Sequence, residues 1–349
     1  MKLLSFEVQG VTGREVRLGA LVTGDADNGA IVDLTAAAQT FFASDGMSAA
    51  GCDRLANALV PPVVLHFIQG GARSREVAEN SLEYVFKNGD EFSPNGGKIY
   101  YSTSEIKHMP AISNPPLLRD FMAFEQHLLN IFPRLNRVIP EQWYQRPVYY
   151  KGNSSSIGGH LQDVKFPKYA QTLDLEFEFA AIIGKGGVNI SEGSARDHIY
   201  GYTIYNDLSA RDIQALEMTV GLGPAKGKDF IGAHVLGPLI VTADEISDPY
   251  NLSMKATVNG EVWSQTNSSG MHWKFEQMIA YASMDEELQV GEVFGSGTCA
   301  NGSGAEQDKF LVPGDRIELT IQNLGKLVNT VSRDADFDPQ QSKHGGSQK

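Results

Sequence analysis

The sequence has almost no cysteine and no long apolar run. Only Cys52 and Cys299 occur in 349 residues, far apart and outside any CxxC pair. We therefore expect neither a disulfide framework nor a zinc site, and a reducing compartment is favoured. No segment reaches the roughly 18 consecutive apolar residues of a membrane span. The first residues are interrupted by Glu7 and lack the apolar stretch of a signal peptide. These absences predict a cytoplasmic protein that does not act in a membrane.

Positive charge is scarce as well. The chain has 29 Lys and Arg residues against 42 Asp and Glu residues, which gives a formal net charge of -13. No basic run offsets this excess, so binding to the phosphate backbone of nucleic acid is not expected. A hydrophobic content of 42% is that of an ordinary globular protein. The length accommodates one or two domains.

Prolines and short periodic patterns divide the chain into three parts. Residues 1–110 predict a small β-rich N-terminal domain, and the proline-rich segment 109–116 marks its boundary. Residues 111–335 predict a second domain, in which a helix at 117–131 is followed mainly by short strands and turns. The polar tail at 336–349 is predicted to be disordered. Expected elements of the N-terminal part are strands at 3–8, 17–22 and 30–33 and helices at 36–42 and 70–84. The predicted fold class is mixed α/β, predominantly β.

Three acids alternate with large apolar residues in Leu173–Phe179. Successive side chains of a strand point to opposite faces, so Asp174, Glu176 and Glu178 are predicted to share one face. The strand continues into Ala180–Ile183, which is apolar on both faces and so predicts a buried position. Buried carboxylates at this spacing repel one another unless they are protonated or a cation lies between them. The pattern therefore predicts a divalent metal site.

A second candidate lies in Leu117–Ile131, where apolar residues recur at helical spacing. Asp120 and His127 are seven residues apart, or two helical turns, and are predicted to project from one face. A surface Asp and a His at the edge of an apolar stripe would also explain the pattern. Convergence with other polar segments would favour a functional site.

A third candidate is Tyr202–Gln214, which predicts a buried strand ending at Asp207 and then a helix. Asp207 or Ser209 at this junction suits a helix cap. Strand ends that lead into helices are also where binding residues gather. Arg211 and Gln214, three residues apart, are predicted to face the same way.

Two glycine-rich segments follow. Gly221–Asp229 lacks the glycine spacing of a phosphate loop, so nucleotide binding is rejected, although Lys228 can still approach an anionic group. Gly295–Glu306 is a small-residue loop whose backbone can approach a ligand closely, although the segment by itself is better explained as a flexible hairpin. Cys299 in this loop is predicted to be a small buried side chain rather than a nucleophile, because no activating His lies near it in sequence.

Taken together, these segments resemble the fumarylacetoacetate hydrolase family from about Leu117 to Val331. The N-terminal part is similar only in its length and β-rich character. The motifs that carry the resemblance are Asp-x6-His (Asp120–His127), Leu-Asp-x-Glu-x-Glu (Leu173–Glu178), Asn-Asp-x-Ser-Ala-Arg-Asp-x-Gln (Asn206–Gln214), Gly-Pro-x-x-Gly-Lys (Gly223–Lys228) and Ser-Gly-Thr with Gly-Ser-x-x-Glu (Ser296–Glu306). Each motif is weak alone, but five in the family's order make chance an unconvincing explanation. The resemblance implies a β-roll or sandwich catalytic domain and a homodimer.

The resemblance also implies a set of metal ligands and catalytic residues. The family's Mg²⁺ or Ca²⁺ ligands match Asp120, Glu176, Glu178 and Asp207, and such all-oxygen sites also suit Mn²⁺. Asp174 belongs to the motif but is not expected to be a ligand. The family's catalytic base matches His127, oriented by Glu306. Residues around the substrate oxygens match Arg211, Lys228 and Gln214.

Further substrate-binding positions follow from the same resemblance. Tyr150 and Thr298 match substrate-contacting positions, and Arg134 matches another if a two-residue gap is allowed. Met122 and Met218 stand where the hydrolase of tyrosine breakdown has tyrosines. This departure argues against fumarylacetoacetate itself as the substrate.

The implied activity is hydrolysis of a carbon–carbon bond in an acylpyruvate or related β-diketo acid. In it, a metal ion acts as a Lewis acid and His127 activates water. The alternative is a decarboxylase, isomerase or dehydratase that acts on a 2-keto acid through a metal-stabilised enolate. The presence of both His127 and Glu306 favours hydrolysis. A catalytically idle member with a binding or scaffold role is the third hypothesis, and the intact ligand set argues against it.

Overall fold

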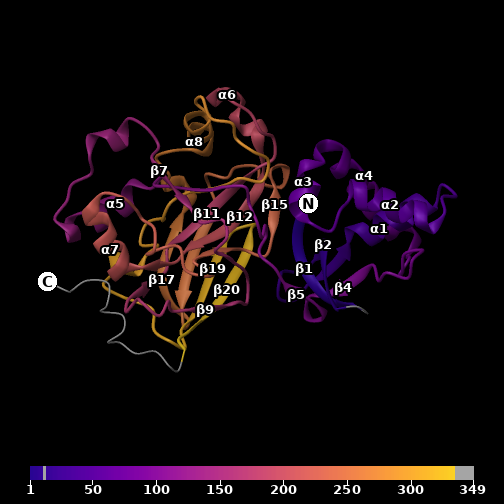
Figure 1. The fold of residues 1–349 in the computed structure, drawn as a ribbon, viewed down its shortest axis with the longest axis horizontal. Coiled ribbons are helices and arrows are strands. Elements are labelled where there is room, and N and C mark those ends of the chain that lie inside the picture. The colour runs from indigo at the N-terminus through magenta and orange to yellow at the C-terminus, as the bar shows by residue number, and fades with distance from the viewer. Residues whose placement is uncertain (11–12, 335–349) are drawn as a thin grey trace.

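The computed structural model describes residues 1–10 and 13–334, and the predicted tail at 336–349 lies outside them. The fold is mixed α/β and mostly sheet, as predicted. The described residues form one sheet of thirteen strands, one sheet of five strands and a separate two-stranded pair. The chain enters the large sheet at once, with a strand over Lys2–Gly10. Figure 1 shows strands running through the middle of the molecule, with helices at both ends and along the top of the larger lobe.

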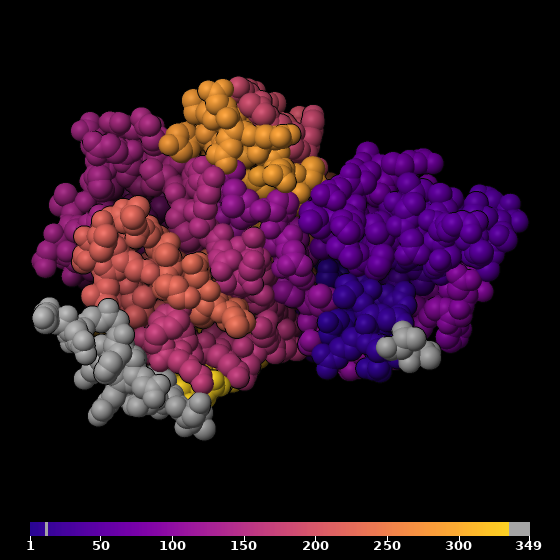
Figure 2. Space-filling model, in the orientation of Figure 1, coloured from indigo at the N-terminus to yellow at the C-terminus, as the bar shows by residue number. Residues whose placement is uncertain are grey.

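The N-terminal part contains helices as well as the predicted strands. The strands and helices expected from the sequence are all present, whereas α2 and α3 were not predicted. These elements are β1 (Lys2–Gly10), β2 (Gly13–Thr23), β3 (Ala30–Asp33), β4 (Tyr100–Ser102), β5 (Lys107–His108), α1 (Leu34–Ala43), α2 (Ala49–Leu59), α3 (Val64–Gln69) and α4 (Gly71–Asn88). Figure 2 shows this part as one lobe beside a larger one.

The two lobes share the large sheet. Its strand order is β4-β3-β2-β1-β15-β12-β11-β18-β6-β7, so β1 of the N-terminal part pairs directly with β15 of the larger lobe. The larger lobe contributes β6 (Leu118–Phe121), β7 (Tyr149–Gly152), β8 (Ile157–Gly158), β11 (Phe177–Ile183), β12 (Ile199–Asp207), β14 (His234–Leu236), β15 (Ile240–Thr242) and β18 (Val293–Gly295). The proposed domain boundary near residue 110 falls between β5 and β6 and stays a prediction.

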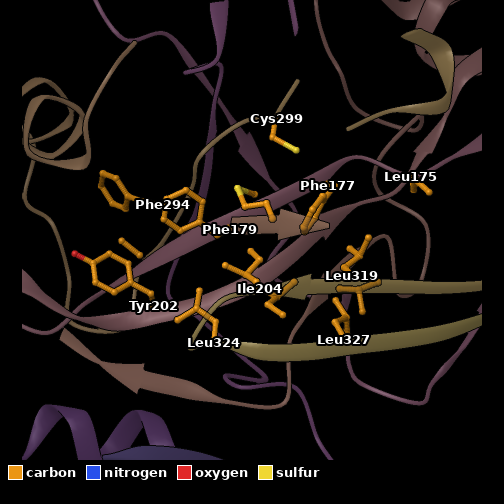
Figure 3. Close-up of a cluster of buried hydrophobic side chains, with 14 of the residues drawn as sticks. Leu175, Phe177, Phe179, Tyr202, Ile204, Phe294, Cys299, Leu319, Leu324 and Leu327 are labelled. Carbon is orange, nitrogen blue, oxygen red and sulfur yellow. The ribbon is translucent and has the colours of Figure 1, made fainter. Parts of the chain in front are cut away.

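The second sheet packs against the first. Its strands are β9 (Asp163–Lys165), β16 (Ser253–Val258), β17 (Glu261–Asn267), β19 (Arg316–Ile321) and β20 (Gly325–Ser332), in the order β17-β16-β19-β20-β9. Phe177 and Phe179 of β11 pack in one buried cluster with Leu319 and Leu327 of this sheet (Figure 3). The opposite side of β11 presents Glu178. The apolar residues of the acidic segment therefore anchor the core and leave its acids on the other face.

Four helices lie around the larger lobe. They are α5 (Glu125–Ile131), α6 (Glu192–Ala195), α7 (Arg211–Val220) and α8 (Phe275–Ala282). Helices α5 and α7 lie at the end of the molecule opposite the N-terminal lobe (Figure 1). Neither Asp207 nor Ser209 caps α7, because its N-cap is Ala210 and no side chain accepts a hydrogen bond there.

Two predicted elements differ from the structure. The helix expected over 117–131 is wrong in its first half, because residues Leu118–Phe121 form β6, between β18 and β7. The strand expected over 173–179 is interrupted: Leu173–Asp174 form the short β10, and β11 begins at Phe177. In both segments, pairing with distant strands determines the backbone more strongly than local periodicity does.

Candidate active site

Four acidic side chains converge at one end of the large sheet. Asp120 lies on β6, Glu178 on β11 and Asp207 at the end of β12, while Glu176 immediately precedes β11. One oxygen from each of the four lies within 4.8 Å of those of the others. The predicted metal ligands are therefore brought together.

A glycine makes this convergence possible. Strand β18 lies between β6 and β11, and its Gly295 is opposite both Asp120 and Ala180. A Cβ atom on Gly295 would lie 2.6 Å from Oδ1 of Asp120 and 2.8 Å from Cε1 of Tyr205. No other residue would leave room for the Asp120 carboxylate to lean across β18 toward the acids of β11 and β12.

The four carboxylates are buried, and only two are neutralised by basic neighbours. Burial, and then the charge of Asp207, raise the pKa of Asp120 well above its usual range. Burial and Asp120 do the same to the pKa of Glu178. Burial alone would also raise the pKa of Asp207, but Lys228 and His234 hold it below its ordinary value. For Glu176, Arg211 and Lys228 likewise outweigh burial and lower the pKa.

The donor set fits a hard divalent cation. Among the described residues, Oδ1 of Asp120 and Oε1 of Glu178 are buried and have no hydrogen-bond partner. Buried carboxylate oxygens without a partner are costly unless a cation binds them. All four candidate ligands are carboxylates, which suits Mg²⁺, Mn²⁺ or Ca²⁺ rather than zinc.

Lys228 and Arg211 balance the other two acids. Nζ of Lys228 lies 2.7 Å from Oε2 of Glu176 and also pairs with Asp207. Nη2 of Arg211 lies 2.7 Å from Oε1 of Glu176, and its Nη1 donates to Oε1 of Gln214 at 2.9 Å. The predicted proximity of Arg211 and Gln214 on α7 is thus present.

His127 and Glu306 form a buried pair beside the acids. Nδ1 of His127, on α5, lies 2.8 Å from Oε1 of Glu306. Glu306 ends the 3₁₀ turn Gly304–Glu306, and its carboxylate accepts the backbone N–H groups of Asn301 at 2.9 Å and Ser303 at 3.1 Å. With Nδ1 engaged by the carboxylate, Nε2 is the ring nitrogen available for proton transfer.

A pocket of about 260 Å³ opens onto these groups. His127, Lys228 and Gln214 line it together with Asp120, Glu176 and Glu178. The predicted substrate-contacting residues Met122, Tyr150, Met218 and Thr298 also line it, along with Phe121, Val148, Tyr149, Gly223 and Pro224. The hydroxyl of Tyr150 donates to Oδ2 of Asp207 at 2.7 Å.

Arg134 is not brought to this pocket. Its guanidinium pairs with Asp308 and is well exposed, with 40% of the side chain accessible. A substrate-binding role for Arg134 has no support in this geometry. Cys299 is fully buried, and burial raises the pKa of its thiol, in keeping with the predicted packing role.

Two groups of residues around the site were not found by sequence reasoning. Tyr205 bonds to Nδ1 of His234 at 2.8 Å, and the same nitrogen lies 3.1 Å from Oδ1 of Asp207. Arg119 is completely buried, and its Nη1 donates to the hydroxyl of Tyr149 at 2.8 Å. In the sequence, only the position of Arg119 next to Asp120 hints that it lies near the site. Nothing in the sequence singles out His234.

Comparison with known proteins identifies the family of the chain. The family profile described as fumarylacetoacetate (FAA) hydrolase C-terminal matches residues 117–332, which is more than half of the chain. The chain belongs to the fumarylacetoacetate hydrolase family. All four acids and the His127–Glu306 pair lie inside the matched range of this family member. Among its described helices, none is long and apolar enough to cross a bilayer.

Two relatives of this family member carry the name oxaloacetate tautomerase. The mitochondrial fahd2 protein of Xenopus laevis is 36% identical over 274 residues, covering 78% of this chain and 79% of the relative. YisK of Bacillus subtilis is 30% identical over 276 residues, covering 78% and 87%. Both proteins are named for an isomerisation rather than for a hydrolysis.

Solved structures show the same fold over nearly the whole chain. A protein from Mycobacterium smegmatis described as a putative HpcE protein superposes with a TM-score of 0.69 at 26% identity, covering 96% of this chain and 100% of that one. Maleylpyruvate hydrolase from Sphingobium sp. SYK-6, in complex with manganese(II) and pyruvate, gives a TM-score of 0.66 at 21% identity, covering 95% and 99%. The second similarity shows the fold alone.

Proposed function

We propose that this protein is a divalent-metal-dependent enzyme that acts on short 2-keto acids through their enolates. The observation that carries the proposal is His127, which is paired with Glu306 and lines a pocket together with three of the four clustered carboxylates. Asp120, Glu176, Glu178 and Asp207 would hold Mg²⁺ or Mn²⁺, which when bound supplies a Lewis acid for the substrate's oxygens.

The first candidate reaction is keto–enol tautomerisation of an oxaloacetate-type acid. The names of the two relatives, both oxaloacetate tautomerases, support it. Nε2 of His127 would take a proton from C3 of the keto form, the enolate oxygen would be protonated from solvent, and the imidazolium would release its proton to solvent. In the reverse direction the enol oxygen loses its proton to solvent and His127 returns one to C3. Glu306 would stabilise the imidazolium formed when Nε2 accepts that proton. Lys228 and Gln214 line the same pocket and would donate hydrogen bonds to the substrate's oxygens.

The second candidate is the hydrolysis predicted from the sequence motifs. Here His127 would take a proton from water as the water oxygen attacks the acyl carbon of an acylpyruvate. The carbon–carbon bond breaks, and the enolate carbon of the leaving half receives a proton. The apolar wall of the pocket, formed by Phe121, Met122 and Val148, favours a substrate with an apolar acyl group. Lys228 is the only Lys or Arg among the described residues that line the pocket, which suits the single carboxylate of an acylpyruvate better than the two of oxaloacetate.

One experiment separates the two reactions. Oxaloacetate and a series of acylpyruvates would be incubated in D₂O with the enzyme and Mn²⁺, and followed by NMR. Deuterium at C3 without loss of the carbon skeleton indicates tautomerisation, whereas release of pyruvate and a carboxylic acid indicates hydrolysis. If neither occurs with any 2-keto acid, the proposal is wrong. The homodimer implied by the family stays a prediction, which light scattering tests.

A further inference from the structure

Asp174 is a buried acid for which the sequence predicted no ligand role. Its Oδ2 accepts from Nε of Arg211 at 2.8 Å, and Nη2 of Arg211 is also 2.8 Å away. Oδ1 accepts the backbone N–H of Gly304 at 2.8 Å, and Oδ2 that of Ala305 at 3.0 Å. The side chain of Asp174 is fully buried, and these bonds neutralise its charge in the interior.

These contacts reach both halves of the proposed site. Arg211, held by Asp174, extends Nη2 to Glu176 at 2.7 Å on the metal-ligand side. Gly304 and Ala305 belong to the same short turn as Glu306, the partner of His127. One carboxylate therefore connects the basic residue beside the acids with the turn that carries the acid of the His127–Glu306 pair.

The turn is packed directly against Asp174. A Cβ atom on Gly304 would lie 2.6 Å from Oδ1 of Asp174 and 1.9 Å from the carbonyl oxygen of Lys309. Only glycine fits between these atoms. The turn cannot move toward Asp174, and its two N–H bonds to Asp174 oppose movement away.

We propose that Asp174 is a positioning residue that fixes the distance between the acidic cluster and the His127–Glu306 pair. The proposal rests on the proposed function for the role of His127. Asp174 touches neither substrate nor metal in this account. It acts through Arg211 on Glu176 and through the Gly304–Glu306 turn on His127.

The test compares Asp174→Asn and Gly304→Ala with the native enzyme. Asparagine keeps the size of the side chain but replaces one acceptor oxygen with a donor. Asp174→Asn should lower both kcat and Mn²⁺ affinity by about 10- to 100-fold, the usual effect of removing a residue that orients ligands. Gly304→Ala should push the turn and Asp174 apart, because the new Cβ would lie 2.6 Å from Oδ1 of Asp174. The His127 signals should then shift and kcat should fall, while Arg211 keeps its contact with Glu176 and Mn²⁺ affinity stays closer to native than in Asp174→Asn.

A spectroscopic readout makes the test independent of the reaction. The ¹⁵N shifts of the His127 imidazole report whether Nδ1 still donates to Glu306, and both variants should shift them. Asp315→Asn is the matched control. Asp315 is also a buried acid that accepts a backbone N–H, from Val312 at 2.8 Å, but it lies outside the site.

Each result decides one question. If the His127 shifts and Mn²⁺ affinity stay native in folded Asp174→Asn, or if Asp315→Asn changes them equally, the positioning role is wrong. If Asp174→Asn fails to fold, Gly304→Ala decides through the same His127 shifts. If the native enzyme turns over no 2-keto acid, the proposed function is wrong. The His127 shifts and the Mn²⁺ titration still test the positioning role of Asp174 in that case.

Discussion

Nδ1 of His127 lies 2.8 Å from Oε1 of Glu306, and Oε2 of the same carboxylate accepts from Nδ2 of Asn130 at 2.7 Å. Hydrogen bonds from other groups thus fix the Glu306 carboxylate in position beside the imidazole. This arrangement places the proton on Nδ1 and presents Nε2 as the basic nitrogen. The imidazole belongs to α5 and the carboxylate to the loop after β18, so the folded structure is required to form the pair.

Replacing His127 should abolish proton transfer without affecting the metal site. His127→Gln should lower kcat by about 10²- to 10⁴-fold, the usual contribution of a positioned general base. The four candidate ligands are all carboxylates, so calorimetric Mn²⁺ affinity should stay within about twofold of native. A variant that retains most of its activity would show that another group transfers the proton.

Glu178→Gln should have opposite effects on stability and on metal binding. Burial and Asp120 raise the pKa of Glu178, so the metal-free protein loses stability as pH rises through that value. Glutamine cannot ionise, and the metal-free variant should unfold at a higher temperature than native protein at neutral pH. With Mn²⁺ the order should reverse, because the variant lacks one anionic ligand. Thermal unfolding with and without EDTA measures both effects. A variant that is less stable in EDTA would contradict this explanation.

Asp33 provides a pH test away from the site. Its Oδ1 accepts the N–H of Ala36 at 2.9 Å and caps α1, and burial raises the pKa of Asp33 to about 6 against the opposing effect of that hydrogen bond. Below pH 4 the folded and unfolded states are both protonated here. Stability is lost as pH rises from about 4 through about 6, because in this range the unfolded state releases the proton that the folded state still holds.

Asp33→Asn should remove this pH dependence. Asparagine still caps a helix, so the cap should be kept. Between pH 4 and 7 the free energy of unfolding of the variant should rise relative to that of native protein by up to about 3 kcal/mol, which corresponds to roughly two units of pKa. Urea unfolding at several pH values measures the difference in the free energy of unfolding. Parallel pH profiles for the two proteins would show that Asp33 ionises normally in the fold.

Adding a cation to the apolar wall should change substrate preference. Met122 lines the pocket and is 37% exposed, so a lysine can be accommodated there. Met122→Lys should shift kcat/KM toward dicarboxylates over acylpyruvates by about two- to fivefold, the range of a partly exposed ion pair. Met284→Lys, an exposed methionine outside this pocket, is the control. Equal shifts in both variants would indicate a general charge effect rather than a local contact.

The acids of the site were predictable, but the elements that carry them were less so. Phe121, Phe124 and Leu128 recur at helical spacing, which concealed the change from strand to helix between Asp120 and His127. The parallel pairing of β6 with β18 places Leu118–Phe121 in the sheet. Strand β18 lies more than 170 residues away in the chain, so no local sequence pattern predicts this pairing.

The alternation of acids in Leu173–Phe179 predicted the position of two of its three acids. Glu176 and Glu178 join the acidic cluster with Asp120 and Asp207, whereas Asp174 belongs to β10 and pairs with Arg211. The break between β10 and β11 separates Asp174 from the other two acids. The groups that support the site, such as Arg119 and His234, come from segments without a recognisable motif. Their roles follow from packing that only the three-dimensional structure shows.

The most direct test of the central claim is deuterium exchange at C3 of a 2-keto acid in D₂O, measured by NMR with metal-loaded enzyme. The account predicts exchange well above the enzyme-free rate for native protein. It also predicts loss of that exchange after chelation, recovery with Mn²⁺, and near-background exchange for His127→Gln. Exchange that persists without metal, or that His127→Gln retains in full, would contradict the account.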